Sequence, residues 1–169
     1  AVLASAMEGC GASAVELNLS CPHASGYGLD IGADPGLVRD VVSRAKAAVG
    51  IPVWVKLSPM VPDIGLIARA AEDAGCDCIV AINTLRAMSI MPEMGRPVLG
   101  NRIGGLSGPA VKPVGVRAVY EIASQVKIPV IGVGGITSGR DALEYLMAGA
   151  SAVQIGSGVR YRGIDVFRK

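Results

Sequence analysis

The segment GASAVELNLS at residues 11–20 recurs almost unchanged as GASAVQIGSG at residues 149–158, and GCDCIVAINT at residues 75–84 has the same shape. In each, a glycine and small residues lead into an apolar run that ends in polar residues. A glycine that ends a helix and leads into a buried strand produces this pattern. A second pair, AVGIPVWVKLSP at 48–59 and QVKIPVIGVGGI at 125–136, places proline at the start of an apolar strand. The sequence therefore predicts five buried strands made from repeated units.

Four amphipathic segments lie between these strands and are predicted to be helices: roughly residues 35–48, 63–74, 112–126 and 139–148. Apolar strands that alternate with helices indicate an α/β protein with a parallel sheet, either a (β/α)8 TIM barrel or a doubly wound sheet. The repeated units favour the barrel, but five strands cannot close one, and a complete barrel takes about 250 residues. We therefore expect residues 1–169 to be an incomplete C-terminal portion of one barrel domain. About three βα units before residue 1 and a helix after residue 169 would complete it.

The composition excludes several classes of protein. With 51% hydrophobic and 18% charged residues, the chain forms a packed core rather than a disordered one. The net charge of +2 and the scattered basic residues predict no nucleic-acid partner. No apolar stretch approaches the roughly 20 residues of a membrane helix, and we expect no membrane association. Four cysteines in a chain with its own core favour reduced thiols in the cytoplasm and no metal site, with Cys10, Cys76 and Cys78 interpreted as small buried apolar residues.

Glycines follow the last two predicted strands, where barrels commonly bind phosphate. Gly134 and Gly135 come after one strand, and Gly156, Ser157 and Gly158 come after the next. Glycine allows an oxyanion to approach backbone N–H groups closely. Either group alone is equally well explained as a tight turn, but together they favour a phosphate-bearing ligand.

Polar residues also end the other strands. Lys56 ends an otherwise apolar strand, where its charge needs an anion or a cofactor as partner unless its chain extends outward to solvent. Asn18, Asn83 and Thr84 end two further strands. Their side chains either hydrogen-bond the edge of a planar heterocycle or only cap turns.

Cys21 follows the first strand in the run NLSCPH and is a candidate nucleophile or acid/base. The only histidine, His23, lies two residues further on, so a Cys/His nucleophilic pair is an alternative. No orienting acid or oxyanion-hole motif supports that pair.

Six segments occur in a characteristic order: ELNLSCP (16–22), VKLSP (55–59), INTL (82–85), GGLSGPAVKP (104–113), IGVGGI (131–136) and GASAVQIG (149–156). Together they cover nearly the whole chain and resemble dihydroorotate dehydrogenase, the flavin enzyme of pyrimidine synthesis. Each segment alone is weak evidence, but the set is highly specific. The resemblance implies an FMN-containing barrel, with dihydroorotate as substrate and orotate as product.

The resemblance also implies roles for individual residues. Cys21 would be the catalytic base, which marks the soluble class; the membrane-associated class has serine there. It would take a proton from C5 of dihydroorotate while C6 delivers hydride to flavin N5. The other implied roles are flavin contact by Asn18, Lys56, Ile82 and Gly108, pyrimidine binding by Asn18, Asn83 and Thr84, and phosphate binding by Gly134, Gly135, Gly156 and Ser157.

One departure keeps other functions open. The family commonly has Asn after Ser-Cys-Pro, whereas this chain has His23. The run SCPH is also similar to dihydropyrimidine dehydrogenase, which reduces uracil and thymine, although GLSGPAVKP at 105–113 looks more like the orotate enzyme. A different class of alternative is a non-catalytic phosphate-binding barrel module.

The resemblance leaves the electron acceptor as either fumarate or NAD, the latter through an iron–sulfur flavoprotein subunit with FAD and a 2Fe–2S cluster. The INTL and GLSG runs look more like the NAD-linked class. The chain has no spacing of cluster ligands, so the cluster would belong to the partner. A cytoplasmic homo- or hetero-oligomer is implied, with the substrate carboxylate bound by a lysine and backbone amides of a preceding segment.

Overall fold

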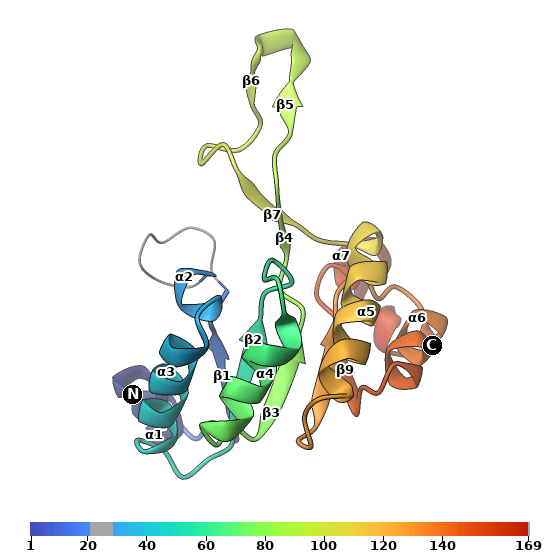
Figure 1. Ribbon diagram of the computed structural model, residues 1–169. Coiled ribbons are helices and arrows are strands. Elements are labelled where there is room, and N and C mark those ends of the chain that lie inside the picture. The colour runs from blue at the N-terminus through green and yellow to red at the C-terminus, as the bar shows by residue number, and fades with distance from the viewer. Residues whose placement is uncertain (21–28, 169) are drawn as a thin grey trace.

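The computed structural model describes residues 1–20 and 29–168. At its centre is a sheet of five parallel strands in the order β1-β2-β3-β8-β9 (Figure 1). The strands are β1 (Val15–Asn18), β2 (Val53–Leu57), β3 (Cys78–Ala81), β8 (Val130–Val133) and β9 (Ala152–Gln154). All five were predicted from the repeated apolar segments. Because every pair is parallel, the carboxyl ends of all five strands lie at the same edge of the sheet.

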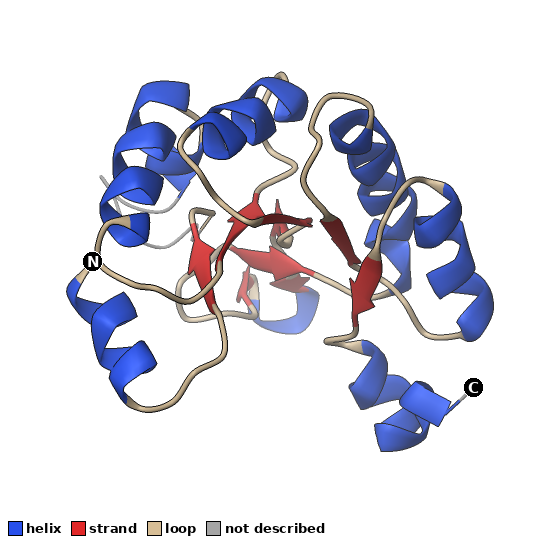
Figure 2. Cartoon of the chain, turned by 90° about the horizontal axis from the view of Figure 1, so that it is seen from below, coloured by secondary structure: helices blue, strands red, loops and turns tan. Residues whose placement is uncertain are grey.

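Four helices cover the outer face of this sheet, and each lies within a predicted segment. They are α3 (Pro35–Lys46), α4 (Ile64–Asp73), α5 (Lys112–Ala123) and α6 (Gly139–Met147). Three begin after a side chain that accepts hydrogen bonds from first-turn N–H groups: Asp34 for α3, Asp63 for α4 and Ser138 for α6. Figure 2 shows the helices in an arc around the strands, which is the arrangement of part of a barrel.

Strand residues alternate between two apolar clusters on opposite faces of the sheet. The larger cluster packs Val55 and Ile79 against the helices. The smaller one, on what we call the inner face, consists of Cys78, Val80 and Ile131, with Trp54 and Val133 partly buried beside them. Since Lys56 is two residues after Trp54 in β2, it lies on the inner face too.

The segment between β3 and α5 was predicted only as a loop, and the structure shows an arm. β4 (Leu85–Ala87) pairs antiparallel with β7 (Gly104–Leu106), and further out β5 (Ile90–Met91) pairs with β6 (Arg96–Pro97). These two antiparallel strand pairs form the arm, which projects from the body of the molecule (Figure 1).

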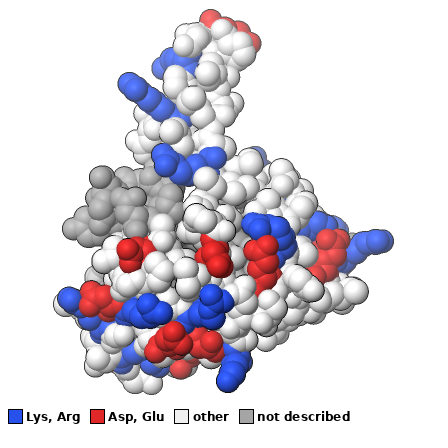
Figure 3. All heavy atoms as spheres, viewed as in Figure 1, with Lys and Arg blue, Asp and Glu red and all other residues white. Residues whose placement is uncertain are grey.

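Several short helices were not predicted either: α1 (Val2–Gly9), α2 (Leu29–Gly32), η1 (Pro92–Met94), η2 (Pro109–Val111), α7 (Gly158–Arg162) and η3 (Gly163–Arg168). Among the helices of the described residues, none has the length and apolar character needed to cross a membrane. Basic and acidic side chains are interspersed over the face seen in Figure 3, as the balanced charge of the sequence predicts.

The three cysteines within residues 1–20 and 29–168 divide into two groups. Cys76 and Cys78 are buried, as expected, and burial raises the pKa of the Cys76 thiol to about 12 and, with the nearby Glu16 carboxylate, that of Cys78 to about 11. The expectation was wrong for Cys10, which is exposed because it caps the C-terminal end of α1 at the surface.

Candidate active site

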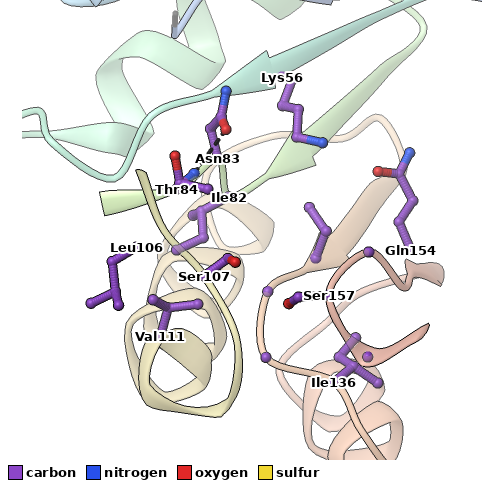
Figure 4. Close-up of a pocket in the computed structure, with 15 residues that line it drawn as sticks. Lys56, Ile82, Asn83, Thr84, Leu106, Ser107, Val111, Ile136, Gln154 and Ser157 are labelled. Carbon is purple, nitrogen blue, oxygen red and sulfur yellow. Dashed lines mark hydrogen bonds between the residues drawn. The ribbon is translucent and has the colours of Figure 1, made fainter. Parts of the chain in front are cut away.

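A cavity of about 200 Å³ lies at the carboxyl ends of β2, β3, β8 and β9 (Figure 4). Nine residues singled out from the sequence line it: Lys56, Ile82, Asn83, Thr84, Gly134, Gly135, Gly156, Ser157 and Gly158. The structure adds six lining residues that the sequence did not single out for this site: Leu106, Ser107, Val111, Val133, Ile136 and Gln154. Residues from across the chain, 56 to 158, therefore form one pocket.

One end of the cavity is made by the glycine loops after β8 and β9. Gly134 and Gly135 have φ of 130° and 70°, which favour glycine whatever the surroundings. A Cβ on Gly135 would also lie 2.9 Å from the backbone nitrogen of Lys112. Gly156 differs, because its φ is not in the left-handed region and a Cβ there would meet no atom within 4 Å. Protein packing thus explains Gly135, whereas Gly156 lines the cavity at a place where no protein atom packs against a Cβ.

Tyr145 of α6 holds the loop after β8 through a hydrogen bond. Its side chain is fully buried, and its hydroxyl donates a 2.8 Å hydrogen bond to the carbonyl oxygen of Gly134. Burial, together with the charges of Asp141 and Glu144, raises the pKa of this phenol, which therefore stays protonated as a donor.

The next residues of the loop are held by Asp141. Its carboxylate accepts hydrogen bonds from the backbone N–H of Thr137 at 3.0 Å, the hydroxyl of Ser138 at 2.9 Å and the ammonium of Lys112 at 2.7 Å. Burial acts to raise the pKa of Asp141, but these donors outweigh it and hold the pKa well below its usual range. The glycine loop is thereby fixed to both α5 and α6.

A hydrogen-bonded cluster connects the ends of β1 and β3. The amide nitrogen of Asn83 donates to the side-chain oxygens of Asn18 at 3.0 Å and Ser20 at 2.6 Å, and the Ser20 hydroxyl donates to Asn18 at 3.0 Å. The side-chain oxygen of Asn83 accepts from the N–H of Thr84 at 2.8 Å. These contacts fix the amide of Asn83 at the cavity wall, with Asn18 behind it rather than in the lining.

Lys56 turns inward rather than out to solvent. Its ammonium lies 3.3 Å from a carboxylate oxygen of Glu16, and its side chain is 21% exposed. The other Glu16 oxygen accepts a 2.8 Å hydrogen bond from the amide of Gln154. The sequence predicted that Lys56 needs an anion or a cofactor as partner unless it extends to solvent, but did not identify Glu16. The alternation of VELN in β1, which places Glu16 and Asn18 on one face, was the available signal.

Two further candidate site residues, Gly108 and Cys21, are not among the lining residues that the structure describes. Gly108 is outside the lining, although it lies beside it: a Cβ on Gly135 would be 2.7 Å from the Gly108 carbonyl oxygen. Cys21, the candidate base, and His23 lie outside the described residues. Among the residues described, no cluster of His, Cys, Asp and Glu has the form of a metal site.

The chain is similar to known proteins over nearly its whole length. A family model for dihydroorotate dehydrogenase matches residues 3–169. The dihydroorotate dehydrogenase B (NAD(+)) catalytic subunit of Methanocella arvoryzae is 58% identical over 157 residues, which are 93% of this chain and 52% of that protein. The corresponding subunit of Methanocaldococcus jannaschii is 57% identical over 155 residues, 92% of this chain and 51% of that protein.

A third relative, the same subunit of Thermoplasma acidophilum, is 56% identical over 162 residues, 96% of this chain and 53% of that protein. The chain thus spans about half the length of the curated relatives it matches. Its five parallel strands and outer helices are part of the TIM barrel of the matched family. With its strand-end motifs in a single cavity, the chain belongs to the dihydroorotate dehydrogenase family.

Proposed function

We propose that the full-length protein is an FMN-dependent oxidoreductase that oxidises (S)-dihydroorotate to orotate in pyrimidine biosynthesis. The observation that carries this proposal is the single cavity that joins the glycine loops of β8 and β9 to the polar ends of β2 and β3. Each relative described above is named for dihydroorotate, which favours this substrate over uracil or thymine.

The lining fits FMN in the chemistry of its parts. Gly134, Gly135 and Gly156 line one end without side chains, which suits the close approach of a phosphate to backbone N–H groups. Ile82 and Val111 contribute an apolar wall for a flat ring. The further lining residues of that wall are Leu106, Val133 and Ile136. Polar side chains that suit the edge of a heterocycle lie at the other end: Lys56, Asn83, Thr84 and Gln154.

Different residues of the chain have different roles in the proposed reaction. Asn83, held by Asn18 and Ser20, presents a fixed amide to the pyrimidine, and Thr84 lies beside it. Lys56 places a positive charge near the ring system, where negative charge develops during hydride transfer. Cys21 takes the proton from C5 of dihydroorotate. Bound FMN supplies the acceptor for the hydride from C6, so that two electrons and one proton leave C6 and one proton leaves C5.

We propose further that residues 1–169 belong to one FMN-binding barrel domain. The relatives are named as catalytic subunits of an NAD(+)-linked enzyme, which supports a partner subunit with FAD and a 2Fe–2S cluster as the route to NAD. A cytoplasmic, oligomeric enzyme follows from this assignment.

The test is anaerobic spectroscopy of the purified full-length protein. We expect a yellow protein whose flavin absorbance is bleached by dihydroorotate and far more slowly, or not at all, by dihydrouracil. Preferential bleaching by dihydrouracil would assign the dihydropyrimidine reaction instead. A colourless protein that takes up no FMN would contradict the proposal and favour a non-catalytic barrel.

A further inference from the structure

We propose that Glu16 is a positioning residue that sets the hydrogen-bonding edge of the cavity by holding Lys56 and Gln154 at the same time. The inference rests on the proposed FMN function and assigns a role to a residue outside the cavity lining.

The Glu16 carboxylate connects strands from opposite edges of the sheet. β1 and β9 are the two edge strands, yet an oxygen of Glu16 in β1 accepts a 2.8 Å hydrogen bond from Gln154 in β9, 138 residues away. The other oxygen lies 3.3 Å from the ammonium of Lys56 in β2. The curved inner face brings these three side chains together, and each carboxylate oxygen has its own partner.

This arrangement determines which hydrogen-bonding groups of the protein face the cavity. Because the Gln154 amide nitrogen is engaged by Glu16, its carbonyl oxygen is left as an acceptor beside the Lys56 ammonium, which is a donor. Lys56 and Gln154 both line the cavity and extend toward the same region of it (Figure 4). A ring edge with a carbonyl next to an N–H, as in the pyrimidine half of a flavin, complements such a pair.

Glu16 also balances the charge of Lys56. At a separation of 3.3 Å in a half-buried position, the carboxylate offsets much of the field of the ammonium. Without it, the positive charge of Lys56 acts alone on the ring. That charge stabilises the more negative, reduced flavin, so loss of the carboxylate makes the midpoint potential more positive.

The test measures the FMN midpoint potential by dye equilibration, and the FMN dissociation constant, of the full-length holoenzyme. We expect Glu16→Gln to shift the potential in the positive direction and Lys56→Met to shift it in the negative direction. In the Lys56→Met background the Glu16→Gln shift should be smaller, because only the direct field of the carboxylate remains there and the contribution from a Lys56 ammonium released from Glu16 is lost. Glu121→Gln is the matched control, since Glu121 pairs with Arg117 on the exposed side of α5; it should change neither quantity.

A second variant separates the two partners of Glu16 and serves if Glu16→Gln does not fold. Gln154→Ala removes the carbonyl acceptor, so it should weaken FMN binding at least about tenfold, equal to about 1.4 kcal/mol. It keeps the Lys56–Glu16 pair, so the midpoint potential should stay near that of wild type.

An unchanged potential and dissociation constant in a flavin-loaded Glu16→Gln protein would overturn this inference and leave the proposed function intact. So would an equal shift with and without Lys56. A wild-type protein that binds no FMN would instead refute the proposed function, and this inference with it.

Discussion

The Tyr145 hydroxyl and the Gly134 carbonyl oxygen are 2.8 Å apart, so a buried phenol on α6 holds the first residue of the loop that closes one end of the cavity. The Tyr145 ring packs closely against Gly115 and Gly132, where a Cβ would clash with it. These two glycines therefore make room for the tyrosine, and the tyrosine fixes the loop. The packing of the core and the position of this loop at the cavity are coupled at this point.

Replacing Tyr145 with Phe keeps the ring packing and removes only the hydrogen bond to Gly134. We expect the full-length protein to lose about 1 kcal/mol of unfolding free energy and to bind FMN more weakly. Urea unfolding and FMN fluorescence titration measure the two effects. Tyr120→Phe is the control, since Tyr120 is 67% exposed on α5. Equal losses in the two variants would contradict the role of Tyr145.

The two kinds of glycine in the loops should respond differently to substitution. Gly135→Ala forces a side chain onto φ of 70° and against Lys112, so we expect the FMN-free full-length protein to be destabilised by about 1–3 kcal/mol. Gly156→Leu meets open space, so we expect unchanged stability but FMN affinity reduced more than about tenfold. Thermal unfolding measures the stability of each variant, and FMN titration measures its affinity for FMN. Normal FMN affinity in Gly156→Leu would place the phosphate elsewhere.

Asp141→Asn should make the free energy of unfolding less dependent on pH in the acid range. The folded-state pKa of Asp141 lies below its ordinary value of 3.8, so its ionised form stabilises the fold at neutral pH, by on the order of 2 kcal/mol. This contribution is complete above pH 3.8 and is lost as the pH falls from there through the lower folded pKa. The difference in unfolding free energy between wild type and Asp141→Asn should therefore shrink below about pH 4.

Denaturant unfolding of the full-length protein across this pH range is the measurement. Asp165→Asn is the control, because the pair of Asp165 with Arg168 is highly exposed. A difference between wild type and Asp141→Asn that stays constant down to the lowest pH would mean that the carboxylate is not held in its ionised form.

Cys21→Ser should slow flavin reduction by dihydroorotate by about 10²–10⁴-fold at neutral pH. Serine is the poorer base at neutral pH because its hydroxyl gives up its proton less readily than a thiol does. The loss should therefore be smaller at high pH. Rapid anaerobic mixing of the full-length protein measures the rate. Cys10→Ser, at the exposed end of α1, should react like wild type. A pH profile that Cys21→Ser leaves unchanged would remove Cys21 from the role of base.

Local patterns predicted the parts of the structure that depend on local residues. The amphipathic segments that form α3 and α6 and the apolar runs that form β2 and β8 could be recognised, because helix and strand burial follow the spacing of neighbouring residues. The glycine loops were also predicted, since they directly follow strands that share one edge of the sheet.

The remaining features depend on contacts between distant residues. The Glu16–Gln154 bond crosses the sheet between its edge strands, and no local pattern indicates that curvature brings them together. The arm was missed for a related reason. β5 and β6 have two residues each, too few for a period-two pattern to stand out from a loop.

The central claim is that one cavity binds FMN with its phosphate at the glycine loops and its ring near Lys56. A crystal structure of the full-length protein with FMN tests this most directly. We predict the phosphate within hydrogen-bonding distance of the backbone nitrogens of Gly135 and Gly156, and the pyrimidine half of the ring beside Lys56 and Gln154. A flavin bound in the opposite orientation, or outside this cavity, would contradict the account.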